Sequence, residues 1–345
     1  MDANRSNPMQ SPILARSRPA PKAIAWRNEL RQAFRRADDL LDFLEINPAD
    51  LPQLADPGFP VLVPRPYAKR INKGDCHDPL LRQVFPDQDE AQVKPGFMAD
   101  PVGDQASRVQ RGLLHKYQGR LLLITTGACA IHCRYCFRQA YPYAQDHFSQ
   151  AQTAPLIAYI DQHPDIEEII LSGGDPLMLD TARLRALTDA LADRPQIKRF
   201  RIHTRLPLAL PSRIDSDLVN WIQSLPWQVV VVIHANHARE YDQEVDQAIA
   251  ALHAVNATVF NQTVLLKGVN DQAEILADLM RRGFEAGVIP YYLHLLDRVS
   301  GAARFEQNEK HALALVEQLR LKLSGYLVPR LVREQAGAPY KLPVL

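Results

Sequence analysis

The sequence lacks a long apolar run, a secretory signal and an excess of charge of either sign. No segment is apolar over the length needed to cross a bilayer, and residues 1–22 are polar and proline-dotted, without the apolar core of a signal peptide. The formal net charge of +1 argues against a nucleic-acid-binding surface. We therefore expect a cytoplasmic protein with no nucleic-acid or membrane partner and with a disordered N-terminus over residues 1–22.

Cysteine is scarce, yet three of the four cysteines stand close together. Cys129, Cys133 and Cys136 fall within eight residues as C-x3-C-x2-C, directly after a predicted apolar strand. A four-iron cluster needs a ligand for each iron, so three thiolates from one loop leave one iron open to a non-protein ligand. This spacing predicts an iron–sulfur centre that takes part in chemistry as well as electron storage.

Two other uses of these cysteines have to be weighed. A structural zinc site normally closes its tetrahedron with a second cysteine pair, which this sequence lacks, but His132 or His147 would complete a three-cysteine, one-histidine site. Disulfides are disfavoured because three neighbouring thiols cannot all pair and no secretory signal is present. A zinc-binding protein without enzymatic activity therefore remains an alternative.

The cysteine spacing, with Tyr135 just before the last cysteine, resembles the signature of the radical S-adenosylmethionine (SAM) enzymes. The resemblance implies a [4Fe-4S] cluster whose open iron binds SAM and whose electron splits SAM to give a 5′-deoxyadenosyl radical. It also implies that the three cysteines are the metal ligands and that Tyr135 contributes to cofactor binding.

Strand and helix patterns alternate through most of the chain. Apolar runs predict six strands, at residues 121–125, 168–171, 199–203, 229–234, 259–266 and 289–296. Helical patterns lie between them, as at residues 214–225, and six successive βα units predict a parallel barrel or a doubly wound sheet. Six units are too few for a closed eight-stranded barrel. The resemblance to the radical SAM enzymes implies an incomplete barrel, which is the core of that family.

We therefore expect an α/β fold built on a partial (β/α)6 TIM-like barrel over residues 113–325. A mainly helical region over residues 23–112, starting with a helix at 23–46, is expected to wrap the barrel, and residues 326–345 form a short C-terminal segment. The chemically loaded motifs follow the carboxyl ends of the predicted strands, where barrel active sites are built.

The segment SGGD at residues 172–175 follows the second predicted strand. Two glycines let a backbone approach a ligand closely, and an acid can accept hydrogen bonds from an ammonium group, although a tight turn would explain the same residues. After the cysteine loop, this segment resembles the motif that holds the methionyl amino group of SAM. The resemblance implies SAM contacts from Gly173, Gly174, Asp175, His234 and Gln262.

From about residue 70 onward the sequence resembles the lysine 2,3-aminomutases. The family's order is kept by RLLLIT at 120–125, CRYCFR at 133–138, LSGGD at 171–175, VLLKGVND at 264–271 and PYY at 290–292. The resemblance adds pyridoxal 5′-phosphate (PLP) as a cofactor, with Lys341 in QAGAPYK as its Schiff-base lysine. Arg120 and Tyr117 match PLP-binding positions, and Lys116 stands where an arginine is usual, keeping the charge but losing the bidentate fork.

The same resemblance implies how a lysine substrate is recognised. Its carboxylate and its remote ammonium must each meet an opposite charge in a site with little water, or lose several kcal/mol on desolvation. Arg138 matches the residue that pairs with the carboxylate. Asp297 matches one acid that holds the ε-ammonium, and Glu334 stands where the clostridial-type enzymes have a second, shorter acid.

The resemblance therefore implies an L-lysine 2,3-aminomutase that forms β-lysine, of R configuration, by radical migration of the amino group. The chain is most similar to the shorter aminomutases whose product is attached to elongation factor P by a lysyl ligase. An electron donor such as flavodoxin or ferredoxin and a homo-oligomer are the other expected partners. An aminomutase for another amino acid, such as glutamate, and a radical SAM enzyme without PLP remain alternatives.

Overall fold

A computed structural model describes residues 22–51 and 58–345, and the predicted disordered segment 1–22 lies almost entirely outside the described residues. Ten strands form one sheet in chain order within the described part. They are β1 (Arg108–Gln110), β2 (Leu113–Tyr117), β3 (Arg120–Thr126), β4 (Glu168–Gly173), β5 (Arg199–Thr204), β6 (Gln228–Ile233), β7 (Thr258–Val264), β8 (Ile289–His294), β9 (Arg330–Arg333) and β10 (Leu342–Pro343).

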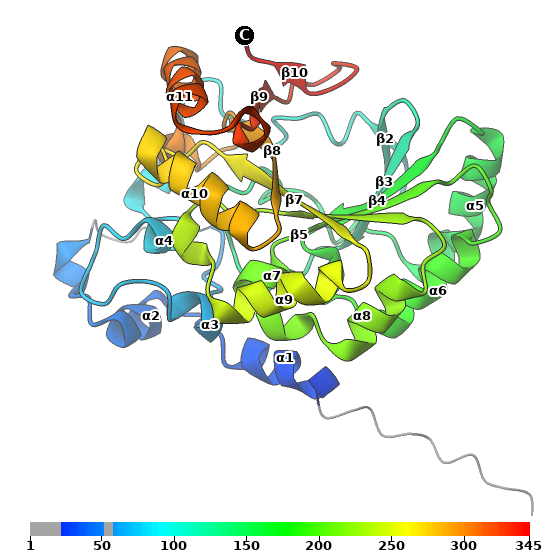
Figure 1. Cartoon of the computed structure of the whole chain (residues 1–345), viewed down its shortest axis with the longest axis horizontal. Coiled ribbons are helices and arrows are strands. Elements are labelled where there is room, and N and C mark those ends of the chain that lie inside the picture. The colour runs from blue at the N-terminus through cyan, green and yellow to red at the C-terminus, as the bar shows by residue number, and fades with distance from the viewer. Residues whose placement is uncertain (1–21, 52–57) are drawn as a thin grey trace, which may run out of the picture.

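The α-helices precede the sheet or lie between its strands. They are α1 (Lys22–Arg31), α2 (Ala37–Leu44), α3 (Arg65–Ala68), α4 (Pro79–Arg82), α5 (Thr153–Gln162), α6 (Thr181–Leu191), α7 (Leu206–Ala209), α8 (Ser216–Gln223), α9 (Gln243–His253), α10 (Ala273–Glu285) and α11 (Glu309–Lys322). In Figure 1, α6, α8 and α9 cover one side of the sheet, whereas the C-terminal hairpin of β9 and β10 forms one end of the sheet, at the top of the view.

The predicted partial (β/α)6 barrel is confirmed. Strands β3 to β8 are all parallel, and each of the six is followed by at least one helix. The sequence prediction missed the short hairpin β1–β2 before them, and it missed β9, which pairs in parallel with β8. Because β1 and β10 form the two edges of the sheet and do not pair with each other, the barrel stays open.

The first predicted helix is wrong in one respect, because the structure divides residues 23–46 into α1 and α2. Between them Phe34 adopts an extended conformation and pairs with Val63, each backbone nitrogen donating to the other residue's carbonyl over 2.8 and 3.0 Å. The bridge buries both side chains in an apolar cluster. Tertiary packing has therefore overridden the helical pattern at this point.

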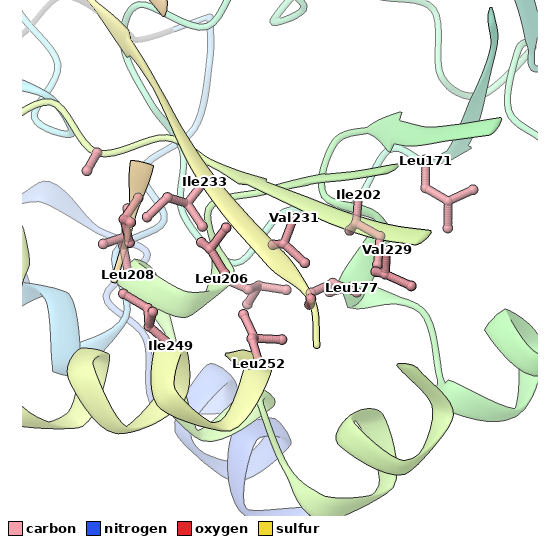
Figure 2. Packing of buried hydrophobic residues seen from close by; sticks show 14 of the residues in the cluster. Leu171, Leu177, Ile202, Leu206, Leu208, Val229, Val231, Ile233, Ile249 and Leu252 are labelled. Carbon is pink, nitrogen blue, oxygen red and sulfur yellow. The ribbon is translucent and has the colours of Figure 1, made fainter. Parts of the chain in front are cut away.

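The main core lies between the sheet and the helices that cover it (Figure 2). Side chains of the parallel strands, such as Ile202 and Val231, point toward Leu206 at the start of α7 and Leu252 on α9. Each of these four side chains is at most 1% exposed, and burying one such side chain contributes about 1.5–3 kcal/mol. This core fixes the strands, so that the loops at their carboxyl ends have defined positions.

A second apolar cluster joins the N-terminal region to the loop that follows β3. It contains side chains from residues 34–85 and also includes Ile131, which lies inside the cysteine loop. The N-terminal region therefore packs directly on that loop. No helix among residues 22–51 and 58–345 is both long and apolar enough to span a bilayer.

Candidate active site

A single cavity of about 1080 Å³ contains all the residues that the sequence predicted for the site. They are Lys116, Tyr117, Arg120, Cys129, Cys133, Tyr135, Cys136, Arg138, Gly173, Gly174, Asp175, His234, Gln262, Asp297, Glu334 and Lys341. The cavity begins at the carboxyl ends of the parallel strands and also reaches Leu122, Ile170 and Arg201 within them. It therefore extends into the interior of the open barrel.

One expectation about location is corrected by this shape. Arg120 is the first residue of β3 and pairs with Tyr117, the last residue of the antiparallel strand β2, so both lie at the amino end of β3. The Arg120 guanidinium carbon lies 4.9 Å from the centre of the Tyr117 ring. The predicted site residues are thus distributed along the cavity and are not all at the carboxyl ends of the strands.

The cysteine loop after β3 is fixed by the N-terminal region. The Arg134 backbone nitrogen donates to the Gln83 carbonyl over 2.8 Å, and the Arg134 side chain donates to Glu90 and to the Phe59 carbonyl. Arg134 is 1% exposed, so these contacts are sheltered from water. The loop that carries the three thiols therefore has a defined shape before any ligand binds.

The three thiols are free, and their surroundings favour a bound metal centre. Burial, and then the neighbouring cysteines, raises the pKa of Cys129 above its usual value and the pKa of Cys136 to about 11. Thiolates are metal ligands, so these groups need a strong positive charge to lose their protons here. An iron–sulfur cluster bound by Cys129, Cys133 and Cys136 would supply that charge.

The zinc alternative gains no support from the geometry. The Nδ1 atom of His132 lies 2.8 Å from the Pro60 carbonyl, and that of His147 lies 2.7 Å from the Tyr143 carbonyl; neither histidine lines the cavity. Across the described parts of the chain, no three histidine, cysteine or acidic side chains are placed to hold one metal ion. The cysteines of a four-iron cluster bind different irons, so their sulfurs need not meet around a single ion.

The two glycines of the SGGD segment are required by the start of the cysteine loop. A Cβ atom on Gly173 would lie 2.5 Å from the Thr126 carbonyl oxygen, and one on Gly174 would lie 2.5 Å from the Ala128 carbonyl oxygen. Gly173 also has φ of +124°, which strains any other residue. The glycines thus let β4 approach the cysteine loop closely. From the sequence we expected them to let the backbone approach a ligand or to form a tight turn.

Asp175 holds the backbone around it. Its carboxylate accepts hydrogen bonds from Leu177 N, Arg205 N and Thr204 Oγ1, at 2.8–3.1 Å. Burial raises the pKa of Asp175 to about 6, although these donors favour the charged form. The carboxylate joins the ends of β4 and β5, and its predicted contact with the ammonium group of SAM stays a prediction.

Gln262 and His234 lie side by side at the ends of β7 and β6. The Oε1 atom of Gln262 is buried and has no hydrogen-bond partner among the described residues, which is unusual for a buried amide oxygen. Burial, and then Arg205, lowers the pKa of His234 to about 3, so the ring is neutral. An unpartnered acceptor beside a neutral imidazole fits a ligand that brings hydrogen-bond donors.

A chain of alternating charges runs through the cavity from Arg138, next to the cysteine loop, to Lys341 near the C-terminus. Arg138 Nε donates to Asp104 over 2.7 Å, and Asp104 also accepts from Lys116 over 3.3 Å. Lys116 Nζ donates to Glu334 Oε1 over 2.6 Å, and Lys341 Nζ donates to Glu334 Oε2 over 2.8 Å. Each acid therefore lies between two cations, and none of the five side chains is more than 20% exposed.

Glu334 lies between two lysines of the chain, Lys116 and Lys341. Although burial acts in the opposite direction, Lys341 and Lys116 hold the pKa of Glu334 well below its usual value. Its carboxylate is therefore charged, and its predicted contact with the ammonium group of a substrate stays a prediction.

Asp297 lines the cavity and forms no ion pair within the described residues. No described side chain donates a hydrogen bond to its carboxylate, and burial, and then Glu334, raises its pKa to about 7. A cation entering the cavity would stabilise the charged form of Asp297. This is the electrostatic environment expected for an acid that binds an ammonium group.

Lys341 lies just before β10 and faces two side chains of β8. Its Nζ atom is 3.2 Å from His294 Nε2 and 5.8 Å from the centre of the Tyr292 ring. Burial, and then Lys341, holds the pKa of His294 well below its usual value, so the imidazole is neutral. The lysine therefore stands between an acid and a neutral base.

Sequence reasoning missed several residues that the cavity contains. Arg205 directly follows β5 and His294 is the last residue of β8, so the rule that active-site residues gather at strand ends could have found them. Ser172, which accepts from Arg138 Nη1 over 2.7 Å, belongs to a segment that was already singled out. Asp104 lies in a region without periodic pattern, and no local signal marks it.

Comparison with known proteins agrees with this geometry. Residues 123–280 match the family described as the radical SAM superfamily. The L-lysine 2,3-aminomutase of Escherichia coli (strain K12) is 43% identical over 94% of this chain and 95% of its own length. That of Haemophilus influenzae is 41% identical over 92% and 94%, and that of Clostridium subterminale is 28% identical over 93% and 77%.

Each of these relatives covers at least 92% of the chain, and as lysine 2,3-aminomutases they are radical SAM isomerases that use a [4Fe-4S] cluster, SAM and PLP. The cavity provides thiols for the first of these cofactors, an unpartnered amide oxygen that could meet the second, and a lysine paired with an acid for the third. The chain belongs to the L-lysine 2,3-aminomutase family of radical SAM enzymes.

Proposed function

We propose that this protein is an L-lysine 2,3-aminomutase, which moves the amino group of L-lysine from C2 to C3 and forms (R)-β-lysine. The observation that carries the proposal is the convergence, in one cavity, of the cysteine loop, the ends of β4 to β8 and the segment around Lys341. When bound, the cluster, SAM and PLP supply the electron, the hydrogen-abstracting radical and a ring that delocalises an unpaired electron.

At the cysteine end, the chain has to hold two cofactors in contact. Cys129, Cys133 and Cys136 are the proposed iron ligands, and the iron left open is the proposed site of SAM. The buried Oε1 atom of Gln262 supports a SAM contact, since a bound donor would satisfy it. Gly173 and Gly174 contribute by letting β4 lie against the cysteine loop.

At the other end, Lys341 is the proposed attachment point of PLP. A lysine amine is a nucleophile only after losing a proton, and the neutral His294 Nε2, 3.2 Å away, can accept a hydrogen bond from the amine and so orient it. Lys116, Arg120 and Tyr117 line the same cavity and are the proposed phosphate contacts. Cations and hydroxyl donors are the groups that a phosphate needs.

The charges near the substrate favour lysine over glutamate. Arg138 is the proposed partner of the substrate carboxylate, because only its Nε and Nη1 are used by Asp104 and Ser172. Asp297 is the proposed partner of the ε-ammonium, since it has no cationic partner among the described residues. A second substrate carboxylate would be repelled by Asp297 and Glu334.

The test is an anaerobic assay with the reconstituted protein, L-lysine, SAM, PLP and a chemical reductant. β-Lysine should form with L-lysine and not with L-glutamate, and Lys341→Ala should abolish both turnover and the borohydride trapping of PLP on the chain. Lys310→Ala, a change on the first turn of α11, is the matched control and should retain both. Isomerisation of glutamate in place of lysine would refute the substrate assignment.

The remaining expectations about partners belong to this proposal. The nearly complete overlap with the relatives from E. coli and H. influenzae supports the shorter subgroup and its link to elongation factor P. Supplying the product, its lysyl ligase and elongation factor P should add the mass of one β-lysyl group to the factor. A flavodoxin- or ferredoxin-type donor, a homo-oligomer and a cytoplasmic location stay predictions, the last because the thiols must remain reduced.

A further inference from the structure

Arg205 is a buried cation that touches one of the proposed cluster ligands. It follows β5 directly, is 6% exposed and donates from Nη1 to the Cys133 sulfur over 2.6 Å. Its Nε atom is buried and has no partner within the described residues. Arg205 was not among the site residues predicted from the sequence, so the predicted site does not explain this contact.

The guanidinium is held in place from its other side. Its Nη2 atom donates to Glu240 Oε2 and to Gln83 Oε1, each over 2.8 Å. The rings of Tyr67 and Tyr135 lie 5.4 and 5.6 Å from the guanidinium carbon. These contacts come from the N-terminal region, the cysteine loop and the segment after β6, so several elements position this one cation.

Glu240 is in turn fixed by the backbone. Its Oε1 atom accepts from the Asn236 backbone nitrogen over 2.8 Å, and its side chain is fully buried. The carboxylate is therefore held in place independently of Arg205, and the orientation of the ion pair is fixed. The positive end of that pair faces Cys133, and the negative end faces away from it.

We propose that Arg205 is a positioning residue that orients Cys133 and raises the reduction potential of the cluster through an N–H···S hydrogen bond. The proposal rests on Cys133 being a cluster ligand, as proposed above. Reduction adds one electron from a flavodoxin- or ferredoxin-type donor, and no bond to the protein forms or breaks. A hydrogen bond to a ligand sulfur, and a cation beside it, both stabilise the form with the extra negative charge.

The network predicts opposite effects for its two charges. Removing the cation with Arg205→Gln should make the cluster harder to reduce, since Glu240 would remain buried beside it. Removing the anion with Glu240→Gln should make the cluster easier to reduce. An arginine that only filled space would not give shifts of opposite sign.

The experiment measures the cluster without SAM, PLP or lysine, so it does not depend on turnover. Full-length wild type, Arg205→Gln, Arg205→Lys and Glu240→Gln are reconstituted anaerobically, and their iron and sulfide contents are measured. Each is then titrated with a reductant at set potentials, and the reduced cluster is followed by electron paramagnetic resonance. Arg213→Gln is the control, because Arg213 is buried and bonded to Leu177 but lies outside the cavity.

At a fixed potential, Arg205→Gln should lower the ratio of reduced to oxidised cluster about tenfold, which is 59 mV for a one-electron couple. Arg205→Lys, which keeps the charge and loses the fork, should give a smaller decrease, and Glu240→Gln should give an increase. Arg213→Gln should leave the ratio unchanged.

An unchanged ratio in an Arg205→Gln protein with full iron and sulfide would overturn the proposal. If that variant assembles no cluster, Arg205→Lys and Glu240→Gln provide the test. The proposal is then refuted if these two variants do not shift the ratio of reduced to oxidised cluster in opposite directions. Wild type that binds no four-iron cluster would instead refute the assignment of the cysteines, so the two failures are distinguishable.

Discussion

At one end of the cavity, three thiols come from eight consecutive residues, whereas at the other end five charged side chains come from separate segments. The cysteine loop is fixed by backbone hydrogen bonds, by close glycine contacts and by one buried arginine. The far end is fixed by side chains of alternating charge, from Arg138 to Lys341. The cysteine end therefore depends on contacts made by one short loop, whereas the far end depends on the pairing of charges from distant segments.

The largest expected effect comes from breaking the cysteine end. Cys133→Ala should reduce bound iron and sulfide to background after anaerobic reconstitution, since a cluster with two protein ligands is poorly held. Cys76→Ala is the matched control, because Cys76 is also a free, partly buried cysteine but lies outside the cavity. Chemical iron and sulfide analysis checks both variants, and equal retention would exclude Cys133 as a ligand.

The charge chain should respond to the loss of its central acid. Glu334→Gln leaves Lys116 and Lys341 without their shared anion, so the free energy of unfolding should fall by about 3 kcal/mol. Glu317→Gln breaks the exposed pair with Arg320 and should change it by less than about 0.5 kcal/mol. Denaturant titration of the two variants measures the difference. Similar small losses would show that the chain of charges does not stabilise the far end.

Asp104 holds Arg138, the proposed partner of the substrate carboxylate, so its role can be tested through the binding of lysine. Asp104→Asn removes the charge that orients Arg138, so KM for lysine should rise about tenfold, with kcat changing less. Ser172→Ala removes a neutral partner of the same guanidinium and should raise KM only about two- to threefold. Steady-state assays would contradict this ordering if Ser172→Ala had the larger effect.

The smallest effect is a pH dependence assigned to Asp297. Its pKa is raised to about 7 in the folded chain, by burial and then by Glu334, against an ordinary value near 3.8 when unfolded. Between these values the folded state binds the proton more tightly, so the contribution of Asp297 to stability is present at low pH and is lost as pH rises toward 7.

Wild type should therefore lose about 1–2 kcal/mol relative to Asp297→Asn between about pH 5 and pH 7.5. Glu334 does not interfere, because its lowered pKa leaves it charged in both states over this range. The buried histidines and Asp175 titrate in both proteins and cancel in the difference. Denaturant unfolding at the two pH values measures it, and a constant difference would show that Asp297 is not perturbed.

The sequence by itself determined the barrel strands and the cysteine end. Alternation of apolar runs and helical patterns is a local signal, and all six predicted parallel strands appear within a few residues of their expected bounds. The cysteine spacing is equally local, since ligands within a stretch of eight residues share one loop whatever the rest of the chain does. Resemblance then named the more distant residues, and all of them line the cavity.

Only the tertiary structure decided which charges meet. Asp104, Glu334 and Arg205 contact partners that are 12 to 218 residues away in sequence, and no local pattern marks such pairs. Glu334 illustrates the difference, because the sequence named this residue by resemblance alone, whereas the fold places two lysines against its carboxylate. The physical reason is that an ion pair forms only between side chains that are close in space. Segments that are distant in sequence come close only once the whole sheet has assembled.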